Sequence, residues 1–162
     1  MSSLLIFAFS DQDGASQMIT EIESLQKEQL IRVSDAATVI RKPDGKIQMK
    51  QATSLVGFGA LGGAFWGMLV GVIFYMPWLG MAGGQTAGAR AGKFSDYGID
   101  DSFIKDVGVT IGPGQSALLL MVSKMPEDRV IEAVSRHKAT LLRTNLSQEN
   151  ENKLREAFAA RA

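Results

Sequence analysis

Short apolar runs alternate with amphipathic stretches along most of this chain. Leu4–Phe9 and Ala117–Val122 are brief and uniformly apolar, which is typical of buried strands. Residues 15–25 repeat apolar side chains at helical spacing, with charged residues on the opposite side, which predicts an amphipathic helix. Ser10 and Asp13 precede that helix at the spacing of a capping box, so Ser10 is the expected N-cap.

The next segments predict a hairpin, and later capping signals predict three more helices. Leu30–Arg41 and Lys46–Lys50 are extended segments joined by Pro43-Asp44-Gly45, a sequence that favours a tight turn. Thr140–Leu146 alternates as a strand does. Helix starts are expected at Asp100, at Pro126 and at Ser147.

These elements predict an α+β fold. A strand–helix–strand unit occurs at residues 4–41 and again at 117–146. Two such units side by side give an antiparallel sheet covered on one face by helices, a ferredoxin-like arrangement. A different α+β sandwich with the same elements is the alternative. The predicted domains are a discontinuous soluble domain, residues 1–50 and 95–162, and an insertion, residues 51–94.

The insertion is defined by its missing charges and by its glycines. From Gln51 to Ala89 there is no Asp, Glu, Lys, Arg or His. Glycines recur every fourth residue in two series, which are Gly59, Gly63, Gly67 and Gly71, then Gly80, Gly84, Gly88 and Gly92. Residues four apart share a helix face, so each series predicts a helix with a glycine stripe. Met76-Pro77-Trp78 separates the two series, and the whole predicts a hairpin whose arms pack through their glycines.

A lipid bilayer is the first setting that suits this hairpin. Residues 54–76 are long enough, at about 1.5 Å per residue, to cross a hydrocarbon core of about 30 Å. Basic residues flank both ends of the hairpin, which predicts a cytoplasmic membrane location with the soluble domain on the cytoplasmic side. The expected membrane-interface residues are Trp66, Tyr75, Trp78, Lys50, Arg90 and Lys93.

Two other settings remain open for the same segment. Hairpins from several copies could pack together inside a cytoplasmic ring or shell, a soluble homo-oligomer that could bind an apolar small molecule. The segment could also be a glycine-rich loop, although uninterrupted helical spacing argues against that. The second arm is the weaker one, because Gln85, Thr86, Arg90 and Lys93 interrupt its apolar character.

Composition narrows the list of partners. Lys plus Arg and Asp plus Glu each number 17, so the net charge is zero and no nucleic-acid partner is expected. The chain has no cysteine, which excludes disulfides and thiolate metal sites. No basic residue precedes the first apolar run, so a cleaved leader is not expected.

No motif points to an enzyme, a cofactor or a metal. Residues 57–62 match a dinucleotide fingerprint, but no acidic residue follows at about 20 positions, so the match is ascribed to the density of glycines. The aspartates at 96, 100, 101 and 106 cluster, but their spacing does not fit a calcium loop, and Asp100 and Asp101 are explained as helix caps and first-turn acids. His137, the single histidine, is expected to be partly buried at a helix end. A non-enzymatic, self-assembling protein is the expected function.

Residues 96–105, Asp-Tyr-Gly-Ile-Asp-Asp-Ser-Phe-Ile-Lys, and residues 112–118, Gly-Pro-Gly-Gln-Ser-Ala-Leu, carry a family resemblance. They resemble the prokaryotic domain-of-unknown-function 1269 family, whose members are often labelled predicted membrane proteins. The glycine hairpin between two soluble halves is similar as well. The resemblance implies a membrane-type hairpin and supplies no catalytic residues.

Overall fold

The computed structural model is an α+β protein, and it describes residues 2–52, 55, 62–74, 94–124 and 126–158. The described strands are β1 (Ser2–Phe9), β2 (Arg32–Arg41), β3 (Ile47–Gln51), β4 (Gln115–Lys124) and β5 (Thr140–Leu146). The described helices are α1 (Gly14–Lys27), α3 (Gly62–Ile73), the 3-10 turn η1 (Phe94–Tyr97), α6 (Asp101–Thr110), α7 (Glu127–His137) and α8 (Gln148–Phe158).

The five strands form one antiparallel sheet in the order β3-β2-β4-β1-β5. β1 and β4 lie in the middle, with Leu5 opposite both Leu120 and Arg143. The predicted turn at residues 43–45 joins β2 to β3, and Gly45 has a φ of +91° there, a conformation that favours glycine.

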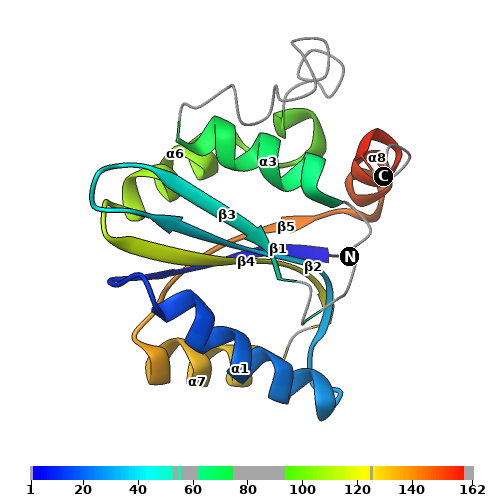
Figure 1. Ribbon diagram of the computed structural model, residues 1–162. Coiled ribbons are helices and arrows are strands. Elements are labelled where there is room, and N and C mark those ends of the chain that lie inside the picture. The colour runs from blue at the N-terminus through cyan, green and yellow to red at the C-terminus, as the bar shows by residue number, and fades with distance from the viewer. Residues whose placement is uncertain (1, 53–54, 56–61, 75–93, 125, 159–162) are drawn as a thin grey trace.

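Helices cover both faces of this sheet (Figure 1). On one face, Leu5 and Phe7 of β1 pack in a cluster with residues of α1 and α7. On the other face, Leu4 and Ile6 pack with residues of α3, α6 and α8. The expectation of a sheet covered on one face is therefore wrong. A strand with a wet face alternates apolar and polar residues, whereas β1 is apolar from Leu4 to Phe9.

The capping prediction is confirmed by a side-chain hydrogen bond at α8 and is wrong at the first helix. Asp100 is the N-cap residue of α6 but makes no side-chain cap bond, and Pro126 is the N-cap residue of α7, one position before its predicted place in the first turn. α1 begins at Gly14, and the Asp11 carboxylate accepts hydrogen bonds from the N–H groups of Asp13 and Gly14. Ser10 lies too far upstream to cap this helix. At α8, Ser147 Oγ accepts a hydrogen bond from the N–H of Asn150, as the sequence predicts.

Polar side chains connect α1 to α7. Arg136 Nη1 donates to both Glu21 oxygens at 2.8 and 2.6 Å, and His137 Nε2 lies 2.9 Å from the same carboxylate. The His137 side chain, at the end of α7, is 18% exposed, which confirms its predicted partial burial. At the start of α7, a hydrogen bond from Arg143 lowers the pKa of the exposed Glu127 carboxyl.

Two valines of α3 test whether this helix belongs to the core. Val70 is fully buried and Val72 is 48% exposed, and both lie in the last turn of α3. Val70→Ala removes two buried methyl groups and should lower the free energy of unfolding by about 2 kcal/mol. Val72→Ala should change it by less than about 0.5 kcal/mol. Urea unfolding of the pair measures both values, and equal effects would contradict the packing of α3 on the sheet.

Candidate functional site

The described part of the predicted hairpin is α3, and its apolar side packs on the sheet. Phe65, Trp66 and Leu69 are all 0% exposed. They belong to the same cluster as Leu4 and Ile6 of β1. The spacing of buried residues along α3 follows the helical repeat, which explains why the sequence forms a helix that lies flat on a sheet.

α3 contacts α6, and a glycine allows the two backbones to approach closely. A methyl group at Gly108 of α6 would lie 2.7 Å from the carbonyl oxygen of Ile73 at the end of α3. That distance is too short for a real side chain, so this crossing depends on the missing Cβ atom. Gly108 was not among the predicted packing glycines, because it lies outside the two glycine series.

Two large apolar side chains are exposed on the outer surface of this helix pair. Val109 of α6 is 79% exposed and Val72 of α3 is 48% exposed. Phe74 directly follows α3, and its side chain is half-buried. The Arg41 guanidinium lies over its ring, with the guanidinium carbon 5.4 Å from the ring centroid. An apolar surface with a cation at its edge suits contact with lipid or with another protein surface.

Arg41 is held in place by the loop before β4. Its Nη1 donates to the carbonyl oxygen of Ile111 at 2.9 Å, and its own carbonyl accepts a hydrogen bond from the Gly114 N–H at 2.6 Å. Its Nε is buried and has no hydrogen-bond partner. Arg41, Lys105, Ile73, Phe74, Gly108 and Val109 line an open cavity of about 200 Å³.

The structure describes three of the predicted packing glycines. Gly63, Gly67 and Gly71 lie in α3, where Gly67 is half-buried and Gly71 is buried. Lys50 is an exposed residue of β3 opposite Thr38. The remaining predicted site residues fall outside the described residues, namely Gly59, Gly80, Gly84, Gly88, Gly92, Tyr75, Trp78, Arg90 and Lys93.

Trp66 differs from its expected place at a membrane interface. Its side chain is fully buried, and its ring packs edge-on against Phe65 at 4.8 Å between centroids. Phe65 in turn packs against Phe94 of η1 at 5.9 Å. The physical reason is the second apolar face of the sheet, which requires large side chains to cover it.

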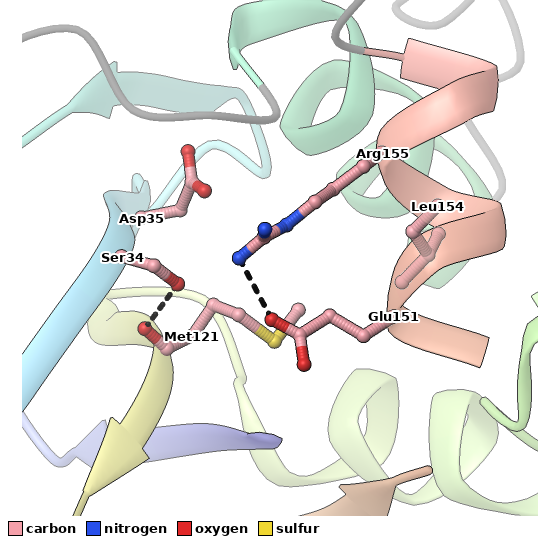
Figure 2. Close-up of a pocket in the computed structure, with 6 residues that line it drawn as sticks. All are labelled: Ser34, Asp35, Met121, Glu151, Leu154 and Arg155. Carbon is pink, nitrogen blue, oxygen red and sulfur yellow. Dashed lines mark hydrogen bonds and ion pairs between the residues drawn. The ribbon is translucent and has the colours of Figure 1, made fainter. Parts of the chain in front are cut away.

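A second group of polar residues lies between β2, β4 and α8 (Figure 2). Asp35 is 1% exposed and Glu151 is 8% exposed. Arg155 Nη2 donates to Glu151 Oε1 at 2.8 Å, and in Figure 2 the guanidinium extends toward the space between the two carboxylates. The space that these residues enclose is about 10 Å³, roughly what one water molecule requires.

An irregularity in β2 produces this polar group. The pairing of β2 with β4 shifts register between Val33 and Asp35, and Ser34 Oγ donates to the Met121 carbonyl at 3.1 Å. The sequence analysis missed the group, although an aspartate within the apolar run of β2 was a signal. Within the part of the chain that the structure describes, no three His, Asp or Glu side chains are grouped so as to hold a metal ion. Beside this group, Leu154 of α8 and Met121 of β4 belong to one apolar cluster, which packs α8 on the sheet.

The fold is α+β, with one antiparallel sheet whose two faces are both covered by helices. A family model described as "Protein of unknown function (DUF1269)" matches residues 60–159, and the chain belongs to this family. No curated protein and no solved structure matches the chain. Among the helices that the structure describes, none combines the length and the apolar character that crossing a membrane requires.

Gly108→Ala tests the close approach of α3 and α6. In an unconstrained helix this change should stabilise by about 1 kcal/mol, because alanine is the better helix former. Here the added methyl group meets the Ile73 carbonyl, so we expect unfolding free energy to fall by about 1–3 kcal/mol.

The control for this variant is Val109→Ala at the neighbouring exposed position of α6. It should leave stability within about 0.5 kcal/mol of the parent. Thermal or urea unfolding gives both values. A stabilised Gly108→Ala protein would show that the two helices are not in contact as described.

Proposed function

We propose that this chain is a non-enzymatic, self-assembling and membrane-associated protein. Its α+β domain would lie at the cytoplasmic side of the membrane, and residues 51–94 would attach it there and join it to other copies. The predicted glycine-striped hairpin provides the contacts, through helix faces that approach closely because side chains are missing.

The surface at the end of α3 is the observation that carries this proposal. The chain passes there from a core helix into the uncharged run that continues to Ala89. The described surface beside this point combines exposed Val109 with the cations Arg41 and Lys105. Apolar side chains bordered by cations are the surface chemistry of a protein that contacts an anionic bilayer.

The neighbouring β2–β3 turn adds to the positive charge on this side. Lys42 and Lys46 are exposed in that turn, next to Arg41. Asp44, the acid between them, accepts a hydrogen bond from the Lys46 N–H. Basic residues beside a membrane segment favour the cytoplasmic side, which supports the proposed orientation.

We also propose that the domain has a ferredoxin-like frame. Without the edge strand β3, the strand order is β2-β4-β1-β5. Two strand–helix–strand units, β1-α1-β2 and β4-α7-β5, interleave in this sheet, and α1 and α7 share one face. In this interpretation β3, α3 and α6 are additions between the two units, and α3 and α6 cover the second face together with α8.

A soluble homo-oligomeric ring or shell is the second candidate. It is favoured by the packing of α3 on its own sheet, because a helix whose large side chains are buried in the domain has little apolar surface left for lipid. In this arrangement residues 75–92 of several copies would pack together in the interior of the assembly. An apolar small molecule could bind there.

Fractionation of the full-length protein, followed by sizing, tests the proposal. We expect the protein to sediment with membranes, to remain there after a carbonate wash, and to run as an oligomer after mild extraction. A soluble oligomer would support the second candidate instead. A soluble monomer would overturn both.

Gly67→Leu tests the role of the glycine stripe within this experiment. The added side chain should lower the size of the assembly, because the glycine face no longer fits its partner. Met68→Leu is the matched control, since the neighbouring position exchanges two side chains of similar volume. Circular dichroism should show both variants folded. An unchanged oligomer in Gly67→Leu would contradict packing through this face.

A further inference from the structure

The cavity between α3, α6 and the end of β2 has two kinds of wall. Ile73, Phe74 and Val109 give it an apolar side. Arg41 and Lys105 give it a cationic side. The acids of α6, Asp101 and Asp106, are not among its lining residues. An opening of about 200 Å³ has room for a headgroup and the first part of a chain, but not for a large ligand.

The two cations are not neutralised within the described part of the chain. None of its ion pairs involves Arg41 or Lys105. Arg41 uses Nη1 for the Ile111 carbonyl, and this bond fixes the guanidinium. Its Nε, by contrast, is buried without an acceptor. Burying part of a charged group is costly, and an anion beside the guanidinium would offset part of that cost.

The accessible part of the Arg41 guanidinium also favours an anion that binds through oxygen atoms, such as a carboxylate or a phosphate. Nη1 donates to the Ile111 carbonyl and Nε has no accessible surface, so Nη2 is the guanidinium donor that remains for a carboxylate or phosphate oxygen. The flat face of the guanidinium lies over Phe74. Lys105 adds a second positive charge from α6.

We propose that this cavity binds the headgroup end of an anionic amphiphile, a molecule with a phosphate or carboxylate group and an apolar tail. Arg41 and Lys105 bind the anion, and Ile73, Phe74 and Val109 contact the tail. Acidic membrane lipids are the source to which the proposal commits. It rests on the proposed membrane association and deepens it by naming the lipid chemistry that the domain recognises.

Calorimetric titration of the full chain with dihexanoyl phosphatidate, below its micelle concentration, tests the proposal. We expect saturable binding that weakens as salt is added, because screening reduces the attraction between the ions. Inorganic phosphate should bind much more weakly, since it lacks the tail. Dihexanoyl phosphatidylcholine should also bind more weakly, since its headgroup has no net charge.

Substitutions of the two cations test whether phosphatidate binds in this cavity. Lys105→Gln should weaken phosphatidate binding about tenfold, because it removes one charge-assisted contact. Lys27→Gln is the matched control, with the same change of net charge on α1 at the opposite face of the sheet, and it should bind as the parent does. Arg41→Gln should weaken binding at least as much as Lys105→Gln, and its thermal unfolding shows whether the domain remains folded.

Four outcomes would overturn the inference. Equal affinity for inorganic phosphate would make the cavity a simple anion site, and equal affinity for phosphatidylcholine would make it an apolar one. Absence of phosphatidate binding, or equal effects of Lys105→Gln and Lys27→Gln, would remove the site altogether. The binding measurements do not depend on fractionation or sizing. A failure to bind phosphatidate can therefore be distinguished from a failure of the proposed membrane association.

Discussion

The structure depends on a sheet that is apolar on both faces. From Leu4 to Phe7, four consecutive side chains of β1 are 0% exposed, although they point alternately to opposite sides. β4 is buried in the same way from Ser116 to Val122. Helices α1 and α7 cover one face, and they leave the second face to α3, α6 and α8. Leaving that face in water would expose several leucines and isoleucines, each worth about 1.5–3 kcal/mol when buried.

This constraint gives α3 two roles. It is a core helix, with Trp66 and Leu69 in the interior, and it leads into the uncharged glycine-rich run. Each buried side chain of α3 would lose its packing if the helix left the sheet for a bilayer, and typical domains are stable by only about 5–15 kcal/mol. The proposed membrane attachment would therefore cost less free energy through the surface beside α3 and through the residues that follow it than through removal of α3 from the sheet. The cations Arg41 and Lys105 lie at that place.

The sequence predicted the elements of the α+β domain well, because periodicity, turns and caps are local signals. The hairpin turn at Gly45 and the cap at Ser147 are examples. It did not predict which surface α3 covers, since a glycine-rich apolar helix looks alike when it packs on lipid or on a sheet. The uninterrupted apolar run of β1 was the clue in the sequence to a second layer of helices. Gly108, Asp35 and Glu151 depend on contacts between distant segments, such as the register shift of β2 against β4, which no local pattern encodes.

The fluorescence of Trp66 tests the position of α3 most directly. The chain has two tryptophans, so Trp78→Phe leaves Trp66 as the reporter. If α3 covers the sheet, its emission should remain blue-shifted and should resist quenching both by acrylamide in solution and by brominated acyl chains in vesicles. Strong quenching by the brominated chains would place Trp66 in lipid. It would contradict a core in which helices, α3 among them, cover both faces of the sheet.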